Sequence, residues 1–262
     1  MQNILKVEKV TESTVRITMD DEKTVNSLSD QMINLLSTTI EEVSVDKLIK
    51  VIVIAATGKI FCSGHNLKEI TAARENNDQG ESYFRDLFES CSTLMQSIVN
   101  CPKPVIAEIN GIATAAGCQL VASCDLAVAS DSSSFATPGV NLGLFCSTPM
   151  VALSRNVKKK DAMKMLLTGD MIDSAEAKRI SLINDHVPSE NLSTEVMELA
   201  NKIASKSMQT VKIGKSAFYK QAELSLSDAY KYTSEIMAEN TMNKDAKEGI
   251  SSFLEKRKPN WE

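Results

Sequence analysis

Residues 105–120 read VIAEINGIATAAGCQL, an apolar run followed at once by a segment built almost wholly of small side chains. An apolar run of this length fits one buried strand, and the small residues after it lead into a helix. A second stretch has the same form, because VIVIAA at 51–56 is followed by the loop TGKIFCSGHNLKEI. Two apolar strands that are each followed by a loop and a helix indicate crossover units with buried parallel strands. The chain is therefore predicted to be an α/β protein.

The segments around these two strands are predicted to form further strands and helices. Periodicity and capping residues predict, in chain order, strands over 4–10 and 15–19, a helix capped by Ser29, a helix over 82–99 and a strand over 125–130. The polar stretch 71–82 is expected to be mobile, and from about residue 159 the pattern is purely helical. We therefore expect an α/β core over residues 1–200 and a helical C-terminal region over 201–262, with no linker between them.

The composition excludes several classes of protein. With 43% hydrophobic and 24% charged residues in 262, the chain has the composition of a soluble globular protein. No run of eighteen apolar residues is present, so no membrane span is predicted. The net charge of -5 argues against nucleic-acid binding, which requires a basic face. The start, MQNILKVEKV, lacks the basic region and apolar block of a secretory signal, which predicts a cytoplasmic protein.

Cysteine and histidine usage gives no sign of a metal site or a disulfide framework. No two cysteines form a CxxC pair, and all six lie among apolar or small residues, so reduced and buried thiols are expected: Cys62, Cys91, Cys101, Cys118, Cys124 and Cys146. One of the two histidines, His186, is expected on a surface loop without a functional role. Asp125, at the start of a strand, is expected to have a structural role.

The loops after the two apolar strands are the candidate chemical centre. A loop of small residues that opens a helix presents backbone N–H groups at the positive end of the helix dipole. Such a position suits an anion or a developing oxyanion. Small residues after a strand also serve close packing alone, and for either loop taken by itself the two interpretations are equally open.

Taken together, five motifs in this order resemble the crotonase, or enoyl-CoA hydratase/isomerase, superfamily over nearly the whole chain. They are FCSGHNLKEI, KPVIAEINGIATAAGCQL, CDLAVASDSSSFATPGVNLGL, LLTGDMIDSAEAKRISLIN and EGISSFLEKRKP. The resemblance implies a spiral of strand-strand-helix turns closed by a helical C-terminal layer that serves trimerisation or acts as a lid. It further implies a homotrimer or a dimer of trimers, and an acyl-CoA thioester as ligand with no separate cofactor.

The resemblance also assigns residues to that ligand. The thioester carbonyl is expected between the backbone N–H groups of His65 and Ala116, which would explain why side chains near 116 are small. Contacts to CoA are implied for Cys62, Gly64 and Lys68 in the first loop. Phe253 and Lys256 are implied to reach the adenosine phosphates of a neighbouring subunit, although the basic run 256–258 equally suits the dipole of a helix end.

Two departures from the family's pattern bear on the chemistry. Hydratases of the family carry a glutamate at each of two positions, which here hold Gln119 and Gly139. Neither replacement transfers a proton near neutral pH, so the two-carboxylate mechanism is in doubt. The His65 imidazole is the candidate substitute, but its ring could equally serve only to hydrogen-bond its loop. Cys146 is a weaker candidate nucleophile, because no base is adjacent and buried thiols usually pack.

Three functional hypotheses follow from this pattern. The first is an enoyl-CoA hydratase/isomerase-type lyase with a rearranged acid-base set. The second is a decarboxylase of malonyl-type CoA esters, since the family's decarboxylases share the Gly-His pair within the first loop and the Val-Asn-Leu-Gly run at 140–143. The third is a protein that binds acyl-CoA esters without turning them over.

Overall fold

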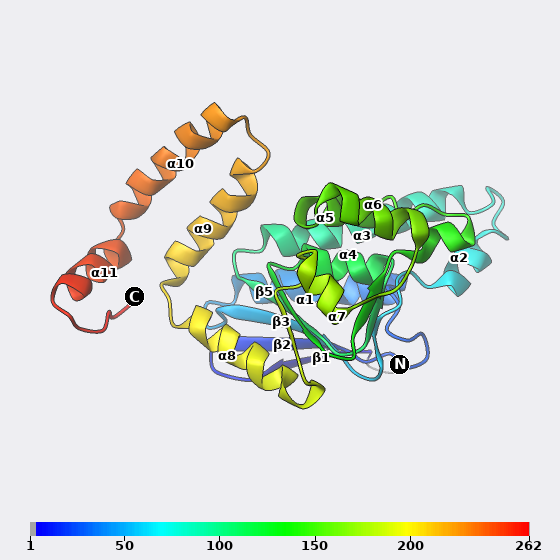
Figure 1. Ribbon diagram of the computed structural model, residues 1–262, viewed down its shortest axis with the longest axis horizontal. Coiled ribbons are helices and arrows are strands. Elements are labelled where there is room, and N and C mark those ends of the chain that lie inside the picture. The colour runs from blue at the N-terminus through cyan, green and yellow to red at the C-terminus, as the bar shows by residue number, and fades with distance from the viewer. Residues whose placement is uncertain (1–3, 262) are drawn as a thin grey trace.

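A computed structural model describes residues 4–261 of the chain (Figure 1). Its larger sheet has six strands in the order β1-β2-β3-β5-β7-β10, of which only β1 is antiparallel to its neighbour. The strands are β1 (Leu5–Lys9), β2 (Thr14–Met19), β3 (Val51–Ala56), β5 (Val105–Ile109), β7 (Leu126–Ser130) and β10 (Asp185–Val187).

A smaller sheet has the order β4-β6-β8-β9, with the first three strands parallel. Its strands are β4 (Ile60–Cys62), β6 (Ile112–Thr114), β8 (Ser134–Ala136) and β9 (Ile172–Asp173). The chain places β3, β5 and β7 in the larger sheet and follows each at once by a strand of the smaller one. This repeated turn is the strand-strand-helix spiral expected from the sequence.

Helices cover both faces of the larger sheet and extend beyond it. They are α1 (Asp30–Val45), α2 (Leu67–Ala73), α3 (Glu81–Asn100), α4 (Ala116–Ser123), α5 (Pro149–Asn156), α6 (Lys159–Thr168), α7 (Ser174–Arg179), α8 (Leu192–Ala204), α9 (Met208–Gln221), α10 (Leu226–Thr241) and α11 (Lys244–Leu254), with 3-10 helices η1 (Pro138–Leu142) and η2 (Ser189–Asn191). No helix within residues 4–261 is long and apolar enough to cross a membrane.

The continuous apolar run at 51–56 is explained by burial on both faces of β3. Ile52 and Ile54 point into the main core, whereas Val51 and Val53 belong to a second cluster under α8. A strand covered on both faces has no solvent side on which to place polar residues. The Ser29 cap is also confirmed, since its hydroxyl accepts a hydrogen bond from the Met32 N–H at 3.2 Å.

Two expectations about local structure are wrong. The region after residue 159 is not purely helical, because β9 and β10 interrupt it. His186 therefore lies on a strand that pairs with β7, not on a loop, and its ring bonds Asp131 at 2.5 Å. The stretch 71–82, which was expected to be mobile, contains the end of α2 at Ala73 and the start of α3 at Glu81.

The last three helices form an arm that projects from the core, as Figure 1 shows for α9, α10 and α11. The predicted boundary at residue 200 falls within α8, which packs on the sheet. A polar contact holds the arm at its base: Lys215 of α9 pairs with Asp125 at 2.6 Å, and the two side chains are only 7% and 15% exposed. Asp125 also accepts hydrogen bonds from the Val105 N–H and the Tyr219 hydroxyl, which confirms its structural role.

Candidate functional site

Three segments that the sequence singled out follow three neighbouring parallel strands. His65 comes three residues after β4, Ala116 two residues after β6, and Gly139 three residues after β8. Because β4, β6 and β8 are adjacent and parallel, their carboxyl ends meet at one edge of the small sheet. That edge is the usual place for a ligand site in parallel sheets.

The first two segments are in direct contact. A Cβ atom added at Gly64 would lie 2.9 Å from the Ala115 Cβ and 3.3 Å from the Ala116 nitrogen. One added at Gly117 would meet the Cys62 carbonyl oxygen and lie 2.8 Å from the Cys62 Cβ. The glycines at 64 and 117 therefore let one loop pack against the other. Close packing thus accounts for both glycines without a ligand.

Two backbone N–H groups remain unpaired where these loops meet. Among residues 4–261, neither the His65 N–H nor the Ala116 N–H donates a hydrogen bond to another protein group. Ala116 is the first residue of α4, a position whose N–H has no partner within the helix. The preceding Ala115 has φ 51° and ψ −116°, a strained conformation of the kind that collects at functional sites.

The His65 side chain is held from two directions. Its Nδ1 lies 3.3 Å from the Leu28 carbonyl oxygen, and residue 65 forms a parallel bridge with Leu28. The ring also meets Phe88 of α3 edge to face, with 5.4 Å between centroids. Burial lowers the pKa of His65, an effect opposed by the Leu28 carbonyl and by the charge of Asp30. The Nε2 atom is buried and has no hydrogen-bond partner among the described residues.

Two further unpartnered polar atoms lie in the other segments. The Gln119 side-chain oxygen is buried without a partner, and so is the Thr137 hydroxyl, which precedes η1. Within residues 4–261 six buried side-chain polar atoms lack partners, and three of them belong to His65, Gln119 and Thr137. Buried polar atoms are normally paired, and each of the three segments carries one that a ligand or water would complete.

The position of the second family carboxylate is filled by the chain itself. A Cβ atom at Gly139 would lie 2.8 Å from both the Cys146 Sγ and the Leu144 carbonyl oxygen. Burial raises the pKa of the Cys146 thiol, and a hydrogen bond with the Gly139 backbone offsets part of that rise. The thiol is therefore uncharged at neutral pH and packs as a small apolar group.

We expect the substitution Gly139→Glu to confer no crotonyl-CoA hydration, because the loop over 144–146 occupies the space that the side chain needs. Gly139→Ala should by itself lower the free energy of unfolding by about 1–3 kcal/mol, measured in urea, as overpacking does. Gly214→Ala is the matched control, since no atom lies within 4 Å of its added Cβ. Hydration of crotonyl-CoA by the Gly139→Glu variant would contradict this expectation, because it would show that the loop over 144–146 moves to admit the side chain.

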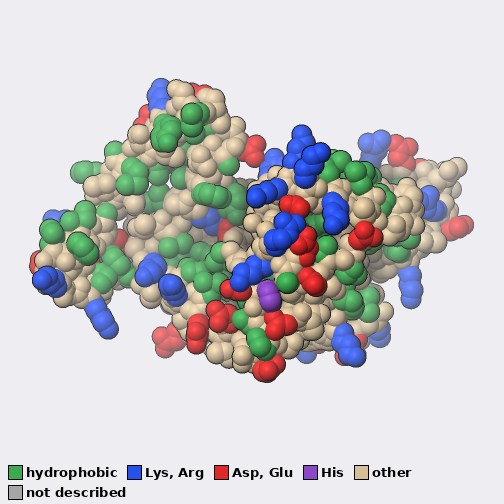
Figure 2. Space-filling model, viewed as in Figure 1, with side chains coloured by type: hydrophobic (Ala, Val, Ile, Leu, Met, Phe, Trp, Pro, Cys, Tyr) green, Lys and Arg blue, Asp and Glu red, His purple; other side chains and the backbone are tan. Residues whose placement is uncertain are grey.

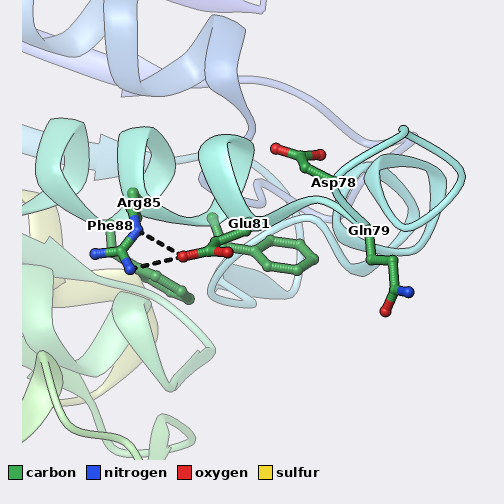
Figure 3. Close-up of a pocket in the computed structure, with 6 residues that line it drawn as sticks. Asp78, Gln79, Glu81, Arg85 and Phe88 are labelled. Atoms are coloured by element: carbon green, nitrogen blue, oxygen red, sulfur yellow. Dashed lines mark hydrogen bonds and ion pairs between the residues drawn. The ribbon is translucent and has the colours of Figure 1, made fainter.

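An open hollow of about 420 Å³ lies at the start of α3 (Figure 3). It is lined by Asp78, Gln79, Glu81, Phe84, Arg85 and Phe88. Arg85 donates to Glu81 at 2.7 Å, and Figure 3 shows Arg85 and Phe88 directed to the same side of the helix. Phe88 contributes to this hollow and also contacts the His65 ring edge to face.

The residues implied to bind CoA do not gather within one chain. Lys68 is exposed on α2, whereas Phe253, 82% exposed, and Lys256 lie at the end of α11. Figure 1 shows α2 and α11 at opposite ends of the molecule. The Cys62 side chain is fully buried in the core. All six cysteines are free and buried, as expected.

The residue pattern alone did not identify three residues of the site or the short strands of the smaller sheet. Leu28, Phe88 and Thr137 carry no chemical signature in the sequence, because a backbone carbonyl, an apolar ring and a hydroxyl are common everywhere. The residue pattern alone placed β4 and β6 within loops and predicted no strand at β8, and only the family resemblance implied a second strand in each turn. Within residues 4–261, no group of three or more His, Cys, Asp or Glu side chains could hold a metal ion.

Known proteins share both the sequence and the architecture. Enoyl-CoA hydratase domain-containing protein 3, mitochondrial, is 51% identical over 246 residues in Xenopus laevis, covering 94% of this chain and 82% of that protein. The human protein of that name is 50% identical over 245 residues, covering 94% and 79%. Their names place those relatives in mitochondria, so the cytoplasmic location predicted for this chain is not confirmed.

Solved structures agree. The crystal structure of human enoyl coenzyme A hydratase domain-containing protein 3 superposes with a TM-score of 0.93 at 47% identity, covering 99% of this chain and 100% of that one. An enoyl-CoA hydratase from Mycobacterium smegmatis gives 0.94 at 42% identity, covering 99% of each chain. Residues 9–262 match the enoyl-CoA hydratase/isomerase family, and the chain therefore belongs to that family.

Proposed function

We propose that this protein binds an acyl-CoA thioester with the thioester carbonyl between the N–H groups of His65 and Ala116. The observation that carries the proposal is the pair of unpaired backbone donors on two loops in contact. Ala116 adds the positive end of the α4 dipole. Family membership supports the ligand class, because acyl-CoA thioesters are the ligands expected from the crotonase resemblance.

Such a pair of donors favours reactions that pass through an enolate. Removal of a proton from the α carbon places negative charge on the thioester oxygen, and preorganised N–H groups stabilise that charge. Isomerisation of an enoyl-CoA and elimination of water from a hydroxyacyl-CoA can both begin in this way. The two-carboxylate route to hydration has no support here, since Gln119 transfers no proton and position 139 has no side chain.

Calorimetric titration with butyryl-CoA and with free CoA tests this proposal. We expect butyryl-CoA to bind at least about tenfold more tightly, because only the thioester offers a carbonyl to the two N–H groups; one well-made hydrogen bond pair supplies roughly 1.4 kcal/mol of net affinity. Equal affinity for the two ligands would exclude a thioester site at 65 and 116.

A second candidate function is binding without turnover. The specific observation in its favour is the loop over 144–146, which fills the place of a family carboxylate with the uncharged Cys146 thiol. A protein of this kind would give the same calorimetric result, while crotonyl-CoA and malonyl-CoA would both remain unchanged during prolonged incubation.

The arm formed by α9–α11 supports a proposed homotrimer or dimer of trimers. Its apolar side chains are exposed in the single chain, as the green groups on the projecting arm in Figure 2 show. They include Phe218 at 63%, Leu226 at 76%, Tyr230 at 70%, Met242 at 86% and Phe253 at 82%. Burial of such a surface against another subunit is favourable. It would also explain why Phe253 and Lys256 lie far from Lys68 within one chain.

A further inference from the structure

We propose that the His65 imidazole is the proton acceptor of this site, taking a proton from the α carbon of the acyl group through Nε2 in place of the absent carboxylates. The inference rests on the proposed acyl-CoA site and assigns its base. It concerns the side chain of His65, whereas the thioester site uses only that residue's backbone N–H.

The hydrogen bond to Leu28 fixes which ring nitrogen is free. A carbonyl oxygen only accepts, so the contact at 3.3 Å requires the proton to be on Nδ1. In a neutral ring Nε2 is then the unprotonated nitrogen with a lone pair. The bridge between residues 28 and 65 and the 2.8 Å bond from the Leu28 N–H to the Gly64 carbonyl hold this carbonyl in place.

The surroundings keep the ring neutral and its Nε2 unoccupied. Burial is the largest influence on its pKa and lowers it, so the base form prevails at neutral pH. The charged or titratable groups on the helices around the ring are Asp30, Glu41 and Glu42 of α1, Lys68 and Glu69 of α2, and Glu81, Tyr83, Arg85, Asp86, Glu89 and Cys91 of α3. Three of these are mutually engaged, because the Tyr83 hydroxyl donates to Asp30 and the Asp30 N–H donates to Glu69. Asp30 is the group whose charge acts on His65.

The first segment also carries the Glu69 carboxylate, which accepts a hydrogen bond from the Asp30 N–H. None of the side chains at positions 118, 119, 137, 139 and 146 is a useful proton acceptor at neutral pH. Gln119 offers an amide, and position 139 has no side chain. Burial holds the pKa of Cys118 at about 12 and raises that of Cys146, so neither thiol ionises. The Thr137 hydroxyl is a weak acid and a poor base.

The step balances without a co-reactant. The bond between the α carbon and its hydrogen breaks, the proton passes to Nε2, and the electron pair moves into the enolate, whose charge rests on the thioester oxygen between the two N–H groups. Return of the proton from the imidazolium restores the thioester. Because Nε2 is buried, an acyl group can reach it only if a neighbouring side chain moves. We infer that this side chain is Phe88, 38% exposed, which contacts the His65 ring and also lines the open hollow. Hydrogen bonds at catalytic groups often form only in the complex.

The test is deuterium incorporation at the α carbon of butyryl-CoA in heavy water, followed by mass spectrometry. We expect exchange catalysed by the wild-type protein and at least about a hundredfold slower exchange in His65→Ala, with butyryl-CoA affinity within about threefold of wild type. Added imidazole should restore part of the rate. The wild-type rate should fall as pH drops below the ordinary histidine pKa of about 6.5, since protonation removes the acceptor.

His186→Gln is the matched control, because His186 is the other histidine of the chain and lies on β10, bonded to Asp131. It should exchange at the wild-type rate. The same variant, labelled with nitrogen-15 in histidine, reports the His65 ring alone by NMR. We expect the proton on Nδ1 and a proton-free Nε2, and this measurement does not depend on the stability of the His65 variants.

The possible outcomes separate the two proposals. Butyryl-CoA binding with wild-type exchange in His65→Ala, or with no exchange in the wild type, overturns the role of the ring and leaves the thioester site intact. A proton found on Nε2 overturns it as well. Failure of butyryl-CoA to bind more tightly than CoA overturns the site itself. Slow exchange in His65→Ala with partial rescue by imidazole supports the proposal.

Discussion

Exchange of the Ala116 backbone amide for an ester is expected to slow deuterium exchange into butyryl-CoA by about a hundredfold or more, the usual effect of losing one oxyanion donor. The substitution replaces the N–H with an oxygen and adds no bulk, which matters because Gly64 packs against this nitrogen. Proline would remove the same N–H but would place its ring against that loop. The rate is measured by mass spectrometry on ester-containing protein.

Stability should change little in the Ala116 ester, because its N–H makes no hydrogen bond within the described residues. The matched control is the ester at Ala115, whose N–H donates to the Ala136 carbonyl at 2.9 Å. That ester should lower the free energy of unfolding by about 1 kcal/mol. A folded Ala116 ester that exchanges deuterium at the wild-type rate would show that the N–H of residue 116 does not face the thioester.

Lys215→Met is expected to lower the free energy of unfolding by about 3–5 kcal/mol, the usual effect of removing one partner of a buried ion pair. Lys215 is 7% exposed, and its ammonium group also donates to the Ile98 and Lys103 carbonyls at 3.0 Å. Its loss leaves the Asp125 charge poorly compensated beneath α9. Urea unfolding followed by circular dichroism measures the change.

Lys212→Met on the same helix is the comparison for this variant, because Lys212 is exposed and should alter stability by less than about 0.5 kcal/mol. If the two variants lose equal stability, the effect comes from the helix and not from the ion pair. A double-mutant cycle with Asp125→Asn then gives the coupling between the two charges. A coupling near zero would show that α9 is held by its apolar contacts alone.

Much of the fold could be predicted from local sequence because its signals are strong and short-range. Burial on both faces requires the continuous apolar run of β3, and the Ser29 hydroxyl marks the start of α1. The replacement of both family glutamates by Gln119 and Gly139 is likewise a property of sequence alone. So is the family itself, since its motifs occur in order along the chain.

Tertiary structure decided what those residues can do. Strands of three residues such as β4, β6 and β8 are too short to show a recognisable strand pattern in the sequence. They form because neighbouring strands supply their hydrogen bonds. Only their adjacency brings residues 65, 116 and 139 to one edge. The unprotonated Nε2 of His65 depends on the Leu28 carbonyl, 37 positions away in the sequence. The lack of space for a side chain at position 139 depends on Cys146. Local sequence determined which groups are present; long-range packing decided which of their atoms remain free to act.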